Sequence, residues 1–153
     1  MNVTLIGMGS GQPENLTLQG LAALRQADLI LGARRLLAVL PAGCTENRAA
    51  AYRPDEVAEL LQTSGAENAV LVYSGDTGFY SGASSMMEKL EALGVRARVL
   101  PGLSSIQLLA AALGTLLCAA LVKRRAGGGM LYTVRFPICL LYTSPSPRDM
   151  RRS

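Results

Sequence analysis

The segment Ala69–Gly82, AVLVYSGDTGFYSG, changes abruptly from an apolar run to a cluster of glycine, aspartate and aromatic residues. The run Val70–Val72 forms a strand readily but is too short for a helix, and turn-forming residues over Ser74–Gly78 then interrupt it. We therefore predict a buried strand, a loop, and a helix that starts at about Gly82. In an open parallel sheet, ligands bind beyond the carboxyl ends of the strands, where glycine lets backbone groups approach closely. This loop is the first place to expect a binding site.

Two more glycine-rich loops also follow predicted strands. The strand Val3–Ile6 leads into Gly7–Gly11, and the strand Val95–Leu100 leads into Pro101–Ser105. Strands that alternate with helices across Met1–Gly114 predict an α/β domain with a parallel sheet and right-handed crossovers. Because the carboxyl ends of parallel strands meet at one edge of the sheet, the three loops should converge there.

Hydrophobic periodicity predicts the remaining elements of this domain. We expect further strands at Asp28–Leu31 and around Ala49–Tyr52, and helices over about Leu16–Gln26, Arg34–Leu40, Val57–Gln62, Ser84–Leu93 and Ile106–Leu113. Asn15 is expected to cap the first helix. The helix after the central loop carries an apolar stripe at helical spacing that should face the core, formed by Met86, Met87, Leu90 and Leu93.

The charge of the chain is unevenly distributed. Residues 1–114 carry eight Lys and Arg against ten Asp and Glu, whereas residues 115–153 carry seven against one. The predicted folded domain is therefore not basic, which argues against a nucleic-acid partner. The chain has no histidine, so it lacks the usual proton shuttle and the commonest metal ligand. Its three cysteines fit neither a zinc site nor a disulfide framework. With no signal peptide at Met1, we expect a cytoplasmic protein without a metal.

Residues 115–153 do not continue the α/β pattern. They show neither helical periodicity nor a convincing pair of strands, and their composition becomes basic and rich in serine and proline. Cys139–Ser153 resembles a translated out-of-frame segment, so we expect residues 115–153 to be a non-native or disordered tail. The uncharged stretch Leu103–Val122 superficially resembles a membrane span. Its polar residues argue against a membrane-spanning helix, and its first half is needed as a helix that covers the sheet. We therefore expect no membrane partner.

The first loop, GMGSG, only partly matches a dinucleotide-binding fingerprint. The extra residues Gln12–Asn15 separate the loop from its helix, and no acid ends the second strand to bind a ribose hydroxyl. No GxxxxGK[ST] segment is present for a nucleoside triphosphate. Each glycine loop taken alone is explained as a tight turn. Three on one edge, with an aspartate in the middle one, favour a ligand site.

Four segments in this order resemble the amino-terminal half of the tetrapyrrole methylase family. They are GMGSGQPENLTLQGLAAL, ADLILGARRLL, VLVYSGDTGFYSGASSMMEKL and VLPGLSSIQLLAAALG. Within the family, the arginine pair after the second strand and the GFY segment favour the precorrin-6Y C5,15-methyltransferase branch, in its carbon-5 methylating part. The resemblance implies a two-domain fold that binds S-adenosylmethionine in the cleft between domains, usually as a homodimer. Residues 1–114 would form the first of those domains, and the second is missing from this chain.

The resemblance also implies roles for individual residues. The cofactor would be lined by Ser10, Ser74, Gly75, Asp76, Phe79, Ser104 and Ser105, largely through backbone groups. Arg34 and Arg35 are candidates for the substrate carboxylates, because guanidinium pairs bidentately with carboxylate, and Tyr80 is a candidate for the ring system. Each has a structural alternative: Asp76 as a turn cap, the arginines as a solvated helix start, and the aromatic residues as packing. Two departures from the family pattern are Ser10 and Thr77, where the family commonly has proline.

Methyl transfer from a sulfonium is an in-line displacement, which needs alignment and exclusion of water rather than a protein nucleophile. We therefore assign no catalytic residue. The leading hypothesis is a fragment of an S-adenosylmethionine-dependent C-methyltransferase that acts on a precorrin or cobalt-precorrin in cobalamin biosynthesis. A decarboxylating methyltransferase subunit or domain is a possible partner. The alternatives are another family activity, such as uroporphyrinogen methylation, and a non-catalytic nucleotide-binding α/β module.

Overall fold

A computed structural model describes residues 1–78, 82–114, 116–117, 120–126, 129–135 and 138–139. The chain divides into two compact units, Met1–Ser105 and Ile106–Ser153. The candidate site residues that the structure describes all lie in the first unit.

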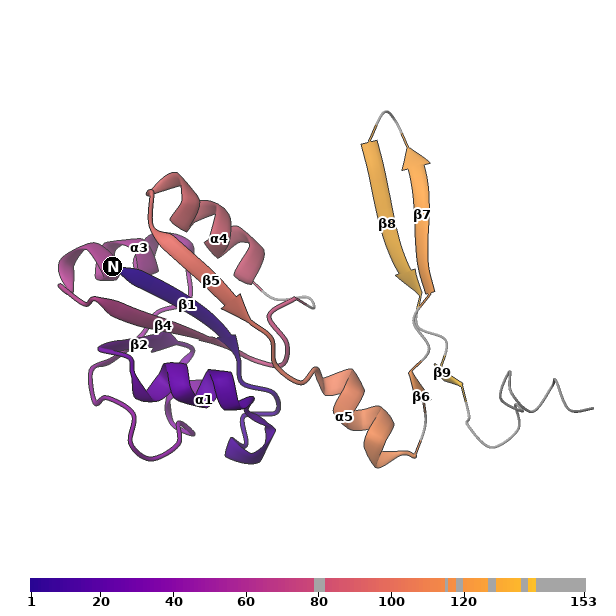
Figure 1. The fold of residues 1–153 in the computed structure, drawn as a ribbon, viewed down its shortest axis with the longest axis horizontal. Helices are drawn as coiled ribbons and strands as arrows, with labels where there is room; N and C mark the ends of the chain where they lie inside the picture. The colour runs from indigo at the N-terminus through magenta and orange to yellow at the C-terminus, as the bar shows by residue number, and fades with distance from the viewer. Residues whose placement is uncertain (79–81, 115, 118–119, 127–128, 136–137, 140–153) are drawn as a thin grey trace, which may run out of the picture. The chain divides into compact units, whose positions relative to one another are not determined.

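The first unit is built on a five-stranded sheet in which every strand pair is parallel (Figure 1). The strands lie in the order β3-β2-β4-β1-β5. Their bounds are Asn2–Gly7 for β1, Leu29–Gly32 for β2, Arg48–Ala50 for β3, Asn68–Tyr73 for β4 and Arg96–Leu100 for β5. The predicted α/β fold with a parallel sheet is confirmed. Since β1 lies between β4 and β5, the three glycine loops leave from three adjacent strands.

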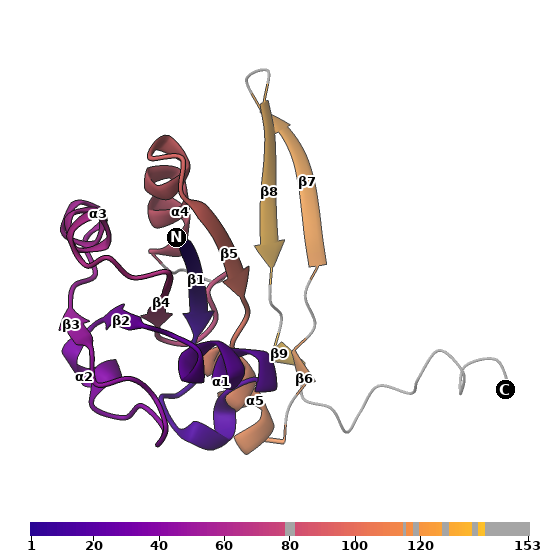
Figure 2. The same ribbon diagram turned by 60° about the vertical axis from the view of Figure 1, so that its left-hand side comes forward.

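Helices cover both faces of this sheet (Figures 1 and 2). On one face, α3 (Pro54–Thr63) and α4 (Ala83–Ala92) bury Val57, Met86 and Leu90 against Leu5 and Leu71 of the strands. On the other face, α1 (Leu18–Arg25) and α2 (Arg34–Leu37) contribute to a second cluster, formed by Leu24, Leu36, Ile6, Ile30, Val70 and Val72 among others. Alternate strand residues thus enter opposite clusters, as the two-residue repeat of a strand requires. The sheet is held rigidly from both sides, which fixes the positions of its loops.

Two local predictions were wrong. A short 3-10 helix, η1 (Pro13–Asn15), precedes α1, so α1 begins later than expected. Its cap is therefore Thr17, whose Oγ1 accepts a 3.0 Å hydrogen bond from the amide of Gly20, and not Asn15. Leu93 does not face the core: it is 39% exposed, because α4 ends at Ala92 and the chain then turns at Gly94.

The second unit contains α5 (Ser105–Ala112, beginning at the last residue of the first unit) and two antiparallel strand pairs. None of the residues of α5 is buried. The strand β7 (Ala120–Ala126) pairs with β8 (Gly129–Arg135), and β6 (Leu116–Leu117) pairs with β9 (Ile138–Cys139).

The expectation of no strand pair after Gly114 is therefore wrong. The paired strands β7 and β8 flank a Gly-Gly dipeptide, which is a sequence signal for a hairpin turn. Residues 140–153 of the predicted tail lie outside the described residues. In the described part of the chain, no helix combines the length and the apolar character needed to cross a membrane.

Candidate functional site

The first two glycine loops are joined directly at the carboxyl edge of the sheet. Gly9 and Gly75 exchange two backbone hydrogen bonds, with N···O distances of 3.1 Å from Gly9 to Gly75 and 2.8 Å in the reverse direction. The amide of Met8 also donates to the carbonyl of Tyr73 at 2.8 Å. Both glycines have left-handed backbone angles, with φ of 60° at Gly9 and 69° at Gly75, which residues with a Cβ rarely adopt. Glycine is thus required for this link.

The third loop closes against the other two. A Cβ on Gly102 would lie 2.5 Å from the carbonyl oxygen of Gly7, and closer still to that of Gly75. A Cβ on Gly7 would in turn lie 2.7 Å from the amide nitrogen of Gly102. Three backbones from different strands meet at van der Waals contact here. The predicted convergence of the loops is confirmed at the level of individual atoms.

Asp76 ties the second loop to the third. Its Oδ1 accepts a 3.1 Å hydrogen bond from the amide of Gly102, and the residue is half-buried. The neighbouring Thr77 is buried, and its Oγ1 donates to the carbonyl of Leu100 at 3.1 Å. Neither bond was expected from the sequence, since each joins residues more than twenty positions apart. Asp76 therefore has a loop-bridging role besides the two that the sequence left open.

The predicted serines occupy different environments around this junction. The hydroxyl of Ser10 accepts hydrogen bonds from Asn15 Nδ2 at 2.6 Å and from the amide of Gln12 at 3.4 Å, so its side chain shapes its own loop. Ser74 is exposed where β4 ends, and Ser105 is exposed at the start of α5. Ser104 is buried beside Gly75: its Cα lies 4.0 Å from where a Cβ on that glycine would stand.

The structure thus brings Ser74, Gly75, Asp76 and Ser104 together at the junction of the second and third loops. Ser10 lies in the first loop, which is joined to the second through Gly9. Phe79 and Tyr80 lie outside the described residues.

A cavity of about 220 Å³ lies beyond the ends of β2 and β4. Arg35 lines it, whereas Arg34 is exposed on α2 and is not among its lining residues. Two tyrosines that the sequence analysis did not single out also line it, Tyr52 after β3 and Tyr73 at the end of β4. Burial raises the pKa of Tyr73 to about 12, so its phenol stays protonated into the alkaline range where an exposed tyrosine ionises.

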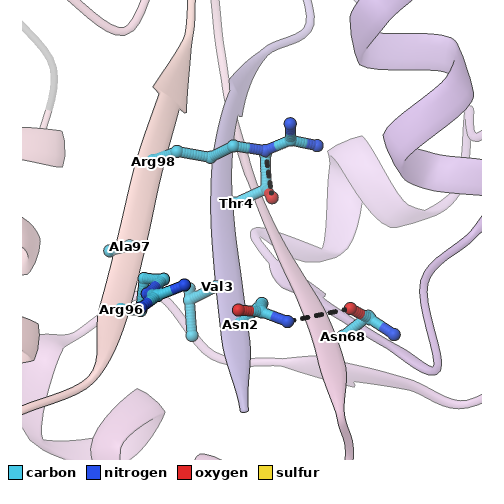
Figure 3. Close-up of a pocket in the computed structure, with 7 residues that line it drawn as sticks. All are labelled: Asn2, Val3, Thr4, Asn68, Arg96, Ala97 and Arg98. Carbon is cyan, nitrogen blue, oxygen red and sulfur yellow. Dashed lines mark hydrogen bonds between the residues drawn. The ribbon is translucent and has the colours of Figure 1, made fainter.

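A second cavity, of about 290 Å³, lies at the opposite edge of the sheet, between the amino ends of the strands (Figure 3). Arg98 Nε donates to Thr4 Oγ1 at 3.1 Å there, and Asn2 Nδ2 donates to Asn68 Oδ1 at 3.5 Å. Glycine loops do not reach this edge, and the amino ends are not where open parallel sheets bind ligands. The smaller cavity is therefore the better candidate. Among the described residues, no three His, Cys, Asp or Glu side chains gather closely enough to hold a metal ion.

Comparison with known proteins identifies the family. A family model described as Tetrapyrrole (Corrin/Porphyrin) Methylases matches residues 2–130. The chain belongs to the tetrapyrrole methylase family. Among curated relatives, it is 30% identical to the cobalt-precorrin-4 C(11)-methyltransferase of Priestia megaterium, over 73% of this chain and 46% of that protein. It is 31% identical to the precorrin-4 C(11)-methyltransferase of Pseudomonas aeruginosa, over 74% of this chain and 48% of that protein.

Solved structures of tetrapyrrole methylases have the same fold. A cobalt precorrin-4 methyltransferase matches with a TM-score of 0.63 and 30% identity, over 76% of this chain and 52% of that one. A uroporphyrin-III C-methyltransferase from Thermus thermophilus, complexed with S-adenosylhomocysteine, matches with a TM-score of 0.59 and 28% identity, over 73% of this chain and 48% of that one. The chain spans about half the length of the relatives that it matches.

Proposed function

We propose that this chain supplies the amino-terminal half of an S-adenosylmethionine-dependent C-methyltransferase that acts on a precorrin or cobalt-precorrin in cobalamin biosynthesis. The observation that carries the proposal is the junction of three glycine loops at the carboxyl edge, fixed by the Gly9–Gly75 pair and by Asp76. Family membership supports the chemistry, since relatives are named as methyltransferases of precorrins and of uroporphyrin-III.

The residues at the junction fit such a cofactor. Loops without Cβ atoms leave backbone amides and carbonyls accessible to a polar ligand, and half-buried Asp76 offers a carboxylate that could also face a cation. We assign Ser10, Ser74, Gly75, Asp76, Ser104 and Ser105 to this site, together with Phe79. When bound, S-adenosylmethionine supplies a methyl group on a positively charged sulfonium.

The chain's own residues bind the methyl donor and the substrate and align them. The three loops hold one another in place, so they present a fixed surface, and a fixed surface lowers the entropic cost of aligning two reactants. The apolar side chains on both faces of the sheet form buried clusters beneath the loops. We assign Arg34, Arg35 and Tyr80 to the substrate, with the arginines pairing to its carboxylates.

We further propose carbon 5 as the site of methylation, on the strength of the segments Gly32–Arg35 and Gly78–Tyr80. The names of the relatives favour a second candidate, carbon 11. NMR of the product formed with a ¹³C-labelled methyl donor separates the two: a labelled methyl on carbon 5 supports our assignment, and one on carbon 11 replaces it. We also propose a homodimer in the cytoplasm, working beside a decarboxylating methyltransferase subunit or domain and without a nucleic-acid or membrane partner.

Equilibrium dialysis with radiolabelled S-adenosylmethionine tests the cofactor site. We expect saturable binding, and about a tenfold or greater loss in Asp76→Ala, because that change frees the third loop from the second. Arg98→Gln, at the opposite edge of the sheet, is the matched control and should bind like the wild type. Equal binding by Asp76→Ala and the wild type would place the cofactor elsewhere.

A further inference from the structure

The cavity beyond β2 and β4 is lined by both apolar and polar residues. The apolar ones are buried: Leu31, Leu71 and Val72 from the strands, Ala51 directly after β3, and Leu36 from α2. The polar ones are Arg35, Tyr52, Tyr73 and Ser74, which carry one guanidinium, two phenols and one aliphatic hydroxyl. Among the described residues that line the cavity, none carries a carboxylate. This combination suits a flat apolar group that carries a negative charge.

Arg35 has its donors available for such a charge. Among the described residues, the ion pairs involve Arg48, Arg53 and Lys89 and not Arg35. Arg35 lies in the first turn of α2, directly after β2, and its side chain is exposed rather than held in the core. A guanidinium in this state binds a carboxylate through two parallel hydrogen bonds.

The two phenols complete the set of donors. Tyr52 is 64% exposed and follows β3, so it reaches the cavity from the sheet edge. Tyr73 is half-buried beside Gly82, and its phenol is protonated at neutral pH and can donate a hydrogen bond. An anion in the cavity would thus meet hydrogen-bond donors that lie after the ends of β2 and β3 and at the end of β4.

We propose that this cavity binds one carboxylate-bearing pyrrole edge of the substrate, with Arg35, Tyr52 and Tyr73 as the groups that hold the carboxylate. This inference rests on the proposed function and adds Tyr52 and Tyr73 to its site. The cavity, at about 220 Å³, is below the range of about 300–1,000 Å³ that encloses a drug-sized ligand. It therefore takes one ring and its side chain rather than the whole macrocycle.

The charge of the cavity separates the substrate from the methyl donor. S-adenosylmethionine carries a sulfonium and an ammonium against a single carboxylate, so its net charge is positive, and its two cations would find a guanidinium here and no carboxylate among the described lining residues. Asp76, at the loop junction, offers the negative charge that those cations require. The two ligands therefore occupy neighbouring but distinct parts of the same edge.

Fluorescence titration of the full chain with uroporphyrin I, a porphyrin with eight carboxylates, tests the inference. We expect about a tenfold weaker affinity in Arg35→Gln and about a threefold weaker affinity in Tyr73→Phe, with Arg98→Gln within twofold of the wild type. An NMR titration adds a readout that a structural role would not move. Pyrrole-3-propanoate should shift the Arg35 Nε signal of the wild type, and its uncharged amide should not.

A parallel titration with S-adenosylhomocysteine distinguishes the possible failures. If Arg35→Gln and Tyr73→Phe are folded and bind uroporphyrin like the wild type, the inference is overturned while the cofactor site stands. If Arg35→Gln loses S-adenosylhomocysteine and keeps uroporphyrin, the cavity belongs to the donor and the inference is wrong. If the wild type binds neither ligand, the proposed function fails as well.

Discussion

A single methyl group at Gly102 tests whether the three glycine loops form one rigid junction. In Gly102→Ala, the new Cβ would lie 2.5 and 2.6 Å from the carbonyl oxygen and carbon of Gly7. The three nearest atoms are all backbone atoms, so rotating a side chain cannot relieve these contacts. Ordinary contact begins near 3.4 Å, and the third loop must therefore withdraw by about 1 Å, which is overpacking at a site that cannot repack.

The expected cost follows from two contributions. Overpacking costs about 1–3 kcal/mol, and the withdrawal weakens the bond from the Gly102 amide to Asp76, which adds about 1 kcal/mol. The sum of about 2–4 kcal/mol should leave the chain folded, because domains of this size are stable by about 5–15 kcal/mol. Urea unfolding followed by far-ultraviolet circular dichroism measures it, with a midpoint lowered by about 1–3 M.

Two further variants make the test specific. Gly82→Ala is the control, since among the described residues its Cβ would meet the Tyr73 ring alone, at an ordinary 3.8 Å, and it should cost less than about 1 kcal/mol. The double variant Gly7→Ala/Gly102→Ala should cost less than the two single changes added together, because both disturb one contact. If Gly102→Ala unfolds within about 0.5 kcal/mol of the wild type, the loops are not packed as described and the reasoning fails.

Three more changes probe other parts of the first unit. Thr17→Ala removes the cap of α1 and should cost about 1 kcal/mol in urea unfolding, whereas Thr17→Ser should cost little; equal stability of the two variants would contradict the assigned cap. Thr77→Val removes the hydroxyl that donates to the carbonyl of Leu100 at a buried site, so it should lower the free energy of unfolding by about 1–2 kcal/mol in the same measurement. Unchanged stability would contradict a stabilising role for that bond. Tyr73 has a folded-state pKa of about 12, above the usual value near 10, so its contribution to stability is complete below about pH 10 and is lost as the pH rises towards 12. Absorbance at 295 nm should show one late-titrating tyrosine that disappears in Tyr73→Phe, and a late phase that persists in that variant would exclude Tyr73 as its source.

The strands and the edge at which the loops meet could be predicted from the sequence. Runs such as Val70–Val72 are apolar and too short for helices, and each is followed by glycine, so both the strand and its end are encoded locally. Parallel strands then place every such loop at the same edge. The family resemblance had largely the same basis, because three of its four segments contain those loops.

The contacts within the site could not be predicted in the same way. The bonds from Asp76 to Gly102 and from Thr77 to Leu100 depend on the order β4-β1-β5, and alternation of strands and helices does not fix that order.

The residues that line the cavity could not be predicted from the sequence either. Arg34 and Arg35 are equivalent in sequence, and only the start of α2 decides that Arg35 lines it. Tyr52 and Tyr73 gave no signal, since each resembles an ordinary residue at a strand end.

The central claim is that the glycine-loop junction is the donor half-site of a methyltransferase, and a ¹⁵N NMR titration with S-adenosylhomocysteine tests it most directly. The method detects millimolar binding, so it reports even on a site completed by other parts of the enzyme. We predict saturable shifts of the amides of Gly9, Gly75 and Gly102, and none at Asn2 or Arg98 on the opposite edge. Saturable shifts confined to that opposite edge, or no shifts in a chain whose spectrum is that of a folded protein, would contradict the claim.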